Sequence, residues 1–169
     1  GSDKILNAMR RRYNRIFYEN RIKKIKSIIP HACIGVDVIV GFPSETDIDF
    51  LDTYRFLNEM DISYLHVFTY SERYNTDAVA IGEVVSKEKR AERSKMLHIL
   101  SDKKKRYFHD QFVGQNRSVL FEHKKNGKIL GHTDNYIQVQ LDGDDDLINT
   151  IHLVKLTKNQ GSIIKGKLG

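Results

Sequence analysis

The chain has 169 residues, of which 40% are hydrophobic, enough to build one domain or two small ones. Its single cysteine, Cys33, excludes a disulfide framework and a cysteine-rich metal site, and it suits a reducing cytoplasm. No apolar run reaches membrane-spanning length, so we expect no membrane partner.

The formal net charge of +6 is unevenly distributed along the chain. Residues 1–29 carry nine basic and two acidic side chains, residues 36–83 two and ten, and residues 86–111 nine and four. Two basic segments around an acidic centre favour a polyanion such as RNA as partner. Charged helix faces exposed to water would give the same pattern, so charge alone leaves both interpretations open.

Helical spacing of hydrophobic residues begins at Ile5 and continues to Ile29, just before Pro30. Asn14 is a suitable N-cap, so we expect a short helix and a longer helix that are divided there. The basic run 10–12 falls at this junction.

The apolar run from Val38 to Val40 predicts a strand near 34–41 that is buried on both faces, as in parallel α/β sheets. After Pro43, Ser44 or Thr46 is expected to cap a helix near 46–60 whose first turn is acidic. Residues 63–70 predict a second strand, which completes a right-handed βαβ unit. A polar loop, 71–85, follows.

Ser86 is expected to cap a basic helix that runs to about residue 111, after which the hydrophobic period changes from 3.6 to 2. Asn126-Gly127 is a strong hairpin signal. Five short strands predict a small closed barrel similar in size to an OB-fold. These strands are 117–123, 128–132, 135–142, 151–156 and 162–167.

The predicted α/β part offers only two strands, too few for a stable parallel sheet. Either the chain is the end of a larger α/β domain, which we favour, or its open sheet edge causes self-association.

Three ordered motifs resemble the radical SAM methylthiotransferases. They are GSDKILNAMRRRY (1–13), DVIVGFPSET (37–46) and LHVFTYSER (65–73), which is followed by Thr76-Asp77-Ala78. The terminal barrel resembles the TRAM domain of that family. The resemblance implies an α/β fold in which residues 1–111 form the C-terminal portion of an incomplete, TIM-like radical SAM barrel. Residues 112–169 would then form a TRAM-like, OB-like RNA-binding β-barrel.

Within the family, the Met9–Tyr13 and Leu65–Phe68 segments are most similar to the cytoplasmic enzymes that methylthiolate C2 of N6-threonylcarbamoyladenosine at position 37 of tRNA. The enzymes that act on isopentenyladenosine tRNA or on a ribosomal protein are near alternatives. A non-catalytic RNA-binding module is the alternative from another class.

The chain departs from the family pattern in two loops and in its cysteines. Ser44 replaces the second glycine of Gly-Phe-Pro-Gly-Glu-Thr, and Tyr74-Asn75 replaces Pro-Gly, although asparagine tolerates positive φ. The family's chemistry uses S-adenosylmethionine and a [4Fe–4S] cluster held by three cysteines in a C-x₃-C-x₂-C motif. The resemblance therefore implies that both cofactors work in a full-length protein with further N-terminal domains. This chain alone is expected to hold no cluster, to provide no catalytic residue and to be inactive.

Candidate cofactor contacts lie where the two predicted strands end. Gly41 would allow close approach of a ligand or simply form a βα turn, and Glu45 would bind polar groups or interact with the helix dipole. Val67 and Phe68 would wall the adenine or pack in the core, and Arg73 would clamp a carboxylate or phosphate. The full set is Ser2, Gly41, Glu45, Val67, Phe68, Ser71 and Arg73.

Candidate RNA contacts are basic side chains for phosphates and one aromatic for stacking on a base. Tyr136 is equally compatible with packing inside the barrel. The seven histidines show no ligand spacing, so no metal site is expected. The RNA candidates are Arg10, Arg11, Arg12, Lys103, Lys104, Lys105, Arg106, Lys124, Lys125, Lys128, Asn135 and Tyr136.

Overall fold

The computed structural model describes residues 1–73 and 75–169, which divide into two units, Gly1–Ser101 and Asp102–Gly169. The division between these two units falls inside helix α4 (Lys87–Asp110), and the domain boundary at 111/112 stays a prediction. The last turns of α4 belong to the second unit, in which the Asn159 amide donates to the Arg106 carbonyl at 3.1 Å. The rings of Phe108 and Phe112 also pack at 5.1 Å, which continues this contact past the helix end.

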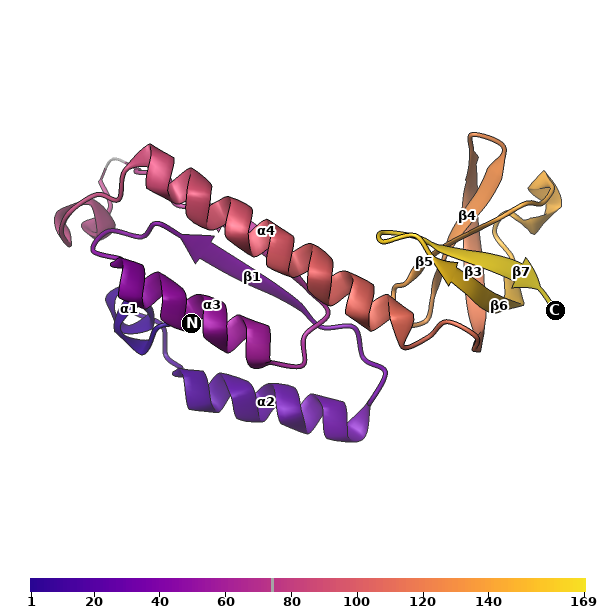
Figure 1. Ribbon diagram of the computed structural model, residues 1–169, viewed down its shortest axis with the longest axis horizontal. Coiled ribbons are helices and arrows are strands. Elements are labelled where there is room, and N and C mark those ends of the chain that lie inside the picture. The colour runs from indigo at the N-terminus through magenta and orange to yellow at the C-terminus, as the bar shows by residue number, and fades with distance from the viewer. Residues whose placement is uncertain (74) are drawn as a thin grey trace. The chain divides into compact units, whose positions relative to one another are not determined.

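Two helices open the first unit, as the hydrophobic spacing predicts: α1 (Asp3–Ala8) and α2 (Arg15–Ile28) (Figure 1). The Asn14 side chain accepts a hydrogen bond from the Phe17 backbone nitrogen at 2.8 Å, so the predicted N-cap is confirmed.

Strand β1 (Gly35–Val40), helix α3 (Asp47–Glu59) and parallel strand β2 (Tyr64–Thr69) form the predicted strand–helix–strand unit. Thr46, not Ser44, caps α3. Its hydroxyl accepts from the Asp49 nitrogen at 3.2 Å, while the Asp49 carboxylate accepts from the Thr46 nitrogen at 3.0 Å. Ser44 instead takes a left-handed conformation (φ 67°).

One face of this two-stranded sheet is covered by helices. Val38 and Val40 of β1 pack in a core with residues of α2, α3, β2 and the first half of α4. The expectation that β1 is buried on both faces is wrong for the described residues: Asp37 is exposed and Ile39 is only half-buried. Helices α2, α3 and α4 pack against the face that carries Val38, so the face that carries Asp37 and Ile39 is only partly covered. A short 3₁₀ helix, Asp77–Ala80, lies in the loop before α4.

The second unit contains a closed five-stranded barrel, as predicted, with the strand order β3-β4-β5-β7-β6. Only the β5–β7 pair is parallel. Asn126 and Gly127 both have positive φ in the β3–β4 turn, which confirms the hairpin signal. The elements are β3 (Asn116–Lys125), β4 (Lys128–Thr133), β5 (Gln138–Leu141), the 3₁₀ helix Asp145–Leu147, β6 (Ile151–Asn159) and β7 (Ile164–Leu168).

The barrel interior is filled by alternate residues of its strands. Val139 and Leu141 point inward while Gln138 and Gln140 point outward, which is the predicted alternation. No helix among the described residues is long and apolar enough to cross a membrane. The fully buried interior side chains are Val119, Phe121, Ile129, Ile137, Val139, Val154, Leu156 and Ile164.

Candidate functional site

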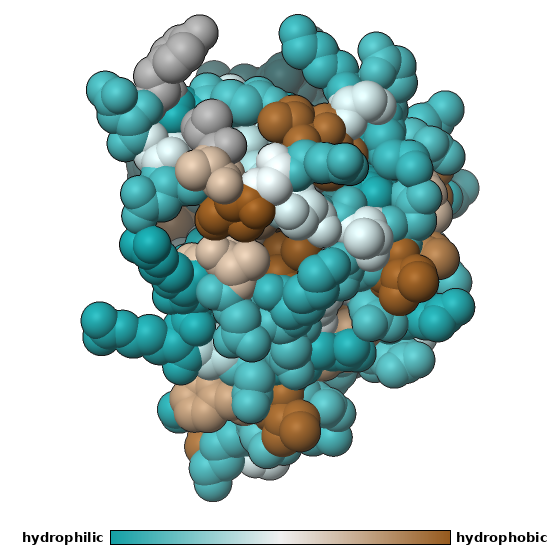
Figure 2. Space-filling view, turned by 90° about the vertical axis from the view of Figure 1, so that its left-hand side faces the viewer, coloured by the Kyte–Doolittle hydropathy of each residue, from teal (hydrophilic) through white to brown (hydrophobic). Residues whose placement is uncertain are grey.

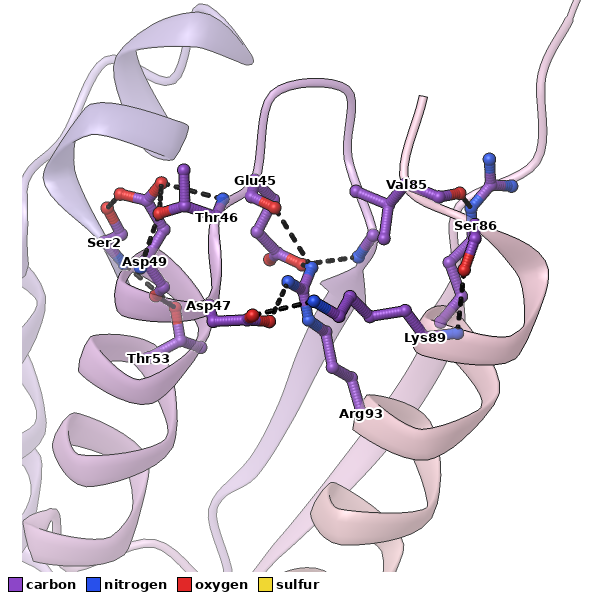
Figure 3. A network of polar contacts seen from close by, with 12 residues as sticks. Ser2, Glu45, Thr46, Asp47, Asp49, Thr53, Val85, Ser86, Lys89 and Arg93 are labelled. Carbon is purple, nitrogen blue, oxygen red and sulfur yellow. Dashed lines mark hydrogen bonds and ion pairs between the residues drawn. The ribbon is translucent and has the colours of Figure 1, made fainter. Parts of the chain in front are cut away.

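A buried ion pair joins the turn after β1 to helix α4 (Figure 3). Arg93 Nη1 donates to Glu45 Oε2 at 2.6 Å, and each side chain is only 3% exposed. Glu45 Oε2 also accepts from the Gly41 backbone nitrogen at 2.8 Å. A second Arg93 nitrogen donates to Asp47 at 2.8 Å, and Lys89 donates to the same carboxylate at 2.7 Å.

Glu45, which the sequence analysis assigned to a cofactor site, accepts these hydrogen bonds from Gly41 and Arg93. Burial raises the pKa of the Glu45 carboxyl, while the Gly41 hydrogen bond and the Arg93 charge act in the opposite direction. Glu45 therefore holds the β1–α3 turn against α4, and the charge of Arg93 balances it in a position with little access to water.

Gly41 and Arg90 make a second close contact at the same strand end. Gly41 has φ 76°, and a Cβ placed there would lie 2.4 Å from Arg90 Cγ, so no larger residue fits. The buried Arg90 side chain donates to the Val85 carbonyl at 2.7 Å and to the Tyr70 carbonyl at 2.9 Å. Its ion pair with Glu72 lowers the pKa of that carboxyl to about 2. Arg90 thus holds the end of β2 and both ends of the loop before α4.

Sequence reasoning missed Arg90 and Arg93 because they lie in a basic run for which only RNA contact and exposure to water were considered. Their spacing carried a usable signal: positions 90 and 93 continue the helical stripe of the buried Leu97 and Leu100. A charged residue on such a stripe is expected to have a buried partner.

Ser2 joins helix α1 to helix α3. Its backbone nitrogen donates to Thr53 Oγ1 and its hydroxyl to Asp49 Oδ1, both at 3.1 Å (Figure 3). Lys4 Nζ donates to the other Asp49 oxygen at 2.7 Å. Desolvation raises the pKa of the Asp49 carboxyl, but hydrogen bonds from Lys4, Thr46 and Ser2 outweigh it and lower the pKa to about 2.

The face of the sheet that the helices leave open borders a pocket of about 500 Å³. Asp37 and Ile39 of β1 line it, together with Phe68 of β2, which lies opposite Ile39 in the parallel register. Half of the Phe68 side chain is exposed. Val67 points to the opposite face and packs against the core, because successive strand residues alternate. Phe68 and Val67 therefore cannot form one wall, and the core alternative is correct for Val67.

The pocket also contains residues that sequence reasoning did not assign to a cofactor site. Its remaining walls come from α1, from the segment between α1 and α2, from the start of α2, and from Thr53, Phe56 and Leu57 of α3. Of the residues predicted to contact a cofactor, Glu45 also lines the pocket. Other lining residues were not predicted, among them Arg11, Tyr13, Asp37 and Ile39.

Ser71 and Arg73 lie exposed after β2, and Tyr74 falls outside the described residues. Among the residues that the structure describes, no ion pair engages the Arg73 guanidinium. Asn75 has φ 65°, which confirms that asparagine adopts the positive φ expected at this turn. Figure 2 views the chain from the side on which this loop lies, and hydrophilic residues cover most of that face.

The basic residues 10–12 and 103–106, predicted to contact RNA, lie in the first and the second unit, respectively. In the first unit, Arg10 pairs with Asp77 at 2.9 Å, and Arg11 and Arg12 are exposed. In the second unit, Lys103 and Arg106 are exposed while Lys104 and Lys105 are half-buried.

The predicted contacts on the barrel have mixed environments. Lys124 donates to Asp145 at 2.7 Å and Lys128 is bonded to Asp142, so both cations already have acidic partners, whereas Lys125 is exposed. Asn135 is buried, and its Oδ1 accepts from the Thr133 hydroxyl at 2.6 Å. Tyr136, with φ 60°, is 79% exposed, so the alternative that it packs inside the barrel is wrong.

The donor set does not fit an iron–sulfur cluster. Cys33, half-buried just before β1, is the single cysteine of the sequence. Across residues 1–73 and 75–169, no three His, Cys, Asp or Glu side chains are placed to hold a metal ion. The single cysteine therefore cannot supply the three thiolates that such a cluster needs.

Comparison with known proteins gives relatives along nearly the whole chain, although no protein-family model matches it. Over 98% of its length it is 34% identical to threonylcarbamoyladenosine tRNA methylthiotransferase MtaB of Bacillus subtilis, of which it covers 39%. The MtaB protein of Aquifex aeolicus is 38% identical over 85% of the chain, which covers 34% of that relative. The tRNA-2-methylthio-N(6)-dimethylallyladenosine synthase of Aliarcobacter butzleri is 35% identical over 99% of the chain, which covers 39% of it. The chain thus spans about two fifths of the length of these curated relatives. Over nearly its whole length, the chain is therefore similar to one part of the MtaB and dimethylallyladenosine synthase types of tRNA methylthiotransferase.

Proposed function

We propose that this chain is the C-terminal part of a tRNA-modifying radical SAM methylthiotransferase that works in the cytoplasm. The observation that carries the proposal is the similarity to tRNA methylthiotransferases, which extends through both structural units. The first unit would be the end of an incomplete TIM-like radical SAM barrel, completed by strands of the missing N-terminal domains. The two-stranded parallel sheet with free edges supports this role. The second unit would be the OB-like TRAM barrel.

In the parent protein, S-adenosylmethionine would bind on the open face of the β1–β2 sheet, where it would supply the radical chemistry of the family. Ile39 and Phe68 provide an apolar surface there for an adenine ring, and Asp37 and Glu45 line the same pocket with carboxylates. Arg73 and Ser71 lie past the end of β2, where an exposed guanidinium would orient a carboxylate. Gly41 and Ser2 would act by holding the turns that shape this pocket.

The proposed substrate is N6-threonylcarbamoyladenosine at position 37 of tRNA, methylthiolated at C2. The family-like Met9–Tyr13 and Leu65–Phe68 segments favour it, and the MtaB proteins are similar over most of the chain. Isopentenyladenosine is the second candidate, because synthases of the corresponding dimethylallyl nucleoside show comparable identity.

The test is nucleoside mass spectrometry of total tRNA from cells that lack the full parent gene. We expect loss of the methylthio group from threonylcarbamoyladenosine alone. Loss from the isopentenyl nucleoside would transfer the assignment to that substrate, and an unchanged tRNA profile would refute the proposal. The last outcome would favour a non-catalytic RNA-binding module or a ribosomal-protein substrate.

Complementation of that deletion tests the pocket. Phe68→Ala in the parent gene is expected to leave most of the substrate unmodified, because it removes the aromatic wall of the open face. Phe17→Ala is the matched control, since Phe17 is an equally exposed aromatic on α2 that does not line the pocket. Equal modification by both variants would contradict the placement of the cofactor on this face. The purified 169-residue chain by itself is expected to form no methylthio nucleoside.

A further inference from the structure

The β6–β7 hairpin places lysines directly opposite one another. In the antiparallel register Lys155 pairs with Lys167, and Lys158 pairs with Lys165 across a bulge. All four side chains are exposed. Like charges directly opposite each other destabilise an antiparallel ladder, so this arrangement weakens the free barrel.

Among the residues with described positions, no acidic side chain relieves that repulsion through a salt bridge. Residues 147–169 contain these four lysines and no Asp or Glu. Elsewhere on the barrel Arg117 pairs with Asp134, and Lys124 and Lys128 have the acidic partners described above. In the part of the chain that the structure describes, none of the four β6–β7 lysines forms an ion pair within 4.0 Å. The acids of the barrel therefore pair with cations elsewhere, and of the four lysines only Lys165 lies near enough to one of them, Asp142, to add to the effect of Lys128 in lowering the pKa of that carboxyl.

Polar and cationic groups surround the four lysines. Lys165 lies beside Gln140 of β5, whose amide donates to the Gln160 side chain at 2.7 Å. At the hairpin tip, Gln160 and Gly161 border a pocket of about 250 Å³ that Lys105 and Arg106 also line, together with one acid, Asp102. The cationic surface thus continues from the two strands to the last part of α4 within the same unit.

We propose that the β6–β7 lysine surface (Lys155, Lys158, Lys165 and Lys167) binds the phosphate backbone of RNA. Phosphates placed between opposed lysines would replace a repulsion by an attraction, and binding would release the condensed counterions of the RNA. The inference rests on the proposed action of the parent protein on tRNA and names the surface that holds it. It differs from the sequence-based choice of Lys124 and Lys128, which are already paired.

The test compares two double variants of the 169-residue chain that each remove two positive charges. K155Q/K167Q removes one opposed pair, and K124Q/K128Q removes two lysines with acidic partners. Binding to a fluorescently labelled tRNA transcript is measured by anisotropy over a series of salt concentrations. At 0.15 M salt, K155Q/K167Q is expected to bind about 20-fold more weakly, and the slope of log K against log salt is expected to fall by roughly 1.4 to 1.8. The K124Q/K128Q variant is expected to lose less than about threefold, because Lys124 and Lys128 are engaged with Asp145 and Asp142 and do not belong to the proposed phosphate contacts.

Thermal unfolding supplies the second readout. K155Q/K167Q is expected to unfold at the same temperature as the wild type or higher, since it removes a repulsion. Lower affinity with unchanged or higher stability excludes misfolding as the cause.

Three results would overturn the inference. The first is an equal loss of tRNA affinity in both variants, and the second is an unchanged salt slope in K155Q/K167Q. The third is a wild-type chain that binds poly-glutamate but not tRNA. The last result would indicate an acidic protein partner. Failure of the proposed methylthiotransferase function is seen separately, in the nucleoside profile of the gene deletion. A lost nucleoside with unaffected K155Q/K167Q binding would reject only the lysine surface.

Discussion

Removal of Arg93 should expose how much the first unit depends on its buried ion pair. In Arg93→Met the Glu45 carboxylate stays buried and keeps the Gly41 hydrogen bond, but it loses the opposing charge at 2.6 Å. Breaking a buried pair by removing one partner costs about 3–5 kcal/mol. The lost contact with the largely exposed Asp47 adds little, and the cation–π contact with Phe50 adds about 0.5–1 kcal/mol. We therefore expect a loss near 4 kcal/mol, a large part of a typical domain's stability.

Hydrogen exchange followed by mass spectrometry is the appropriate assay, because it reports on peptides from β1 and α4 separately from the barrel. Glu45→Gln together with Arg93→Met should cost clearly less than Arg93→Met alone, since the double variant leaves no buried charge. A loss below about 1 kcal/mol in Arg93→Met, or a double variant as unstable as the single one, would refute this account of the pair.

The pH dependence of the same variant has a definite sign. Burial already raises the pKa of folded Glu45, and without Arg93 the pKa rises further. A carboxyl whose folded pKa lies above its unfolded value destabilises the fold once it is ionised, so the penalty is full at pH values above the folded pKa. The difference between Arg93→Met and wild type should thus shrink as pH falls and the carboxyl is protonated. A difference that does not change between pH 7 and pH 4.5 would contradict this reasoning.

Three further predictions concern local features. Asp49→Asn should flatten the acid dependence of stability, which acid titration followed by circular dichroism would measure. The pKa of the Asp49 carboxyl falls from 3.8 in the unfolded chain to about 2 in the folded chain. The carboxylate therefore stabilises the fold above pH 3.8, and this stabilisation is lost as the pH falls toward 2. Asn14→Ala should cost about 1 kcal/mol and increase hydrogen exchange in the first turn of α2. Gly131→Ala should destabilise the barrel by roughly 1–3 kcal/mol in thermal unfolding, since its Cβ would lie 2.1 Å from the Leu120 backbone oxygen; unchanged stability would show that the strands can separate there.

Local order was largely predictable from short stretches of sequence. Asn14 and Thr46 cap helices because their side chains reach backbone nitrogens two or three residues ahead, and Asn126-Gly127 forms its turn because both residues accept positive φ. Ile137, Val139 and Leu141 face the barrel interior because strand residues alternate. The similarity to methylthiotransferases was equally visible in ordered motifs.

Contacts between segments far apart in the chain were not predictable in this way. Whether Glu45 meets a ligand or Arg93 depends on helix α4, which lies almost fifty residues further along and whose packing the turn sequence does not contain. Sequence analysis gave Val67 and Phe68 the same two possible roles. Because the helices pack on one face of the sheet, Val67 contacts the core and Phe68 lines the pocket.

The sequence by itself determined most of the elements, their caps and turns, and the similarity to tRNA methylthiotransferases, because each of these depends on neighbouring residues or on ordered motifs. The tertiary structure decided which charges are used internally and which stay available. Lys124 and Lys155 look alike in the sequence, yet the barrel closes Lys124 onto Asp145 and sets Lys155 opposite Lys167. The physical reason is that strand register and helix packing bring distant residues together, and the electrostatic environment of a side chain depends on those neighbours.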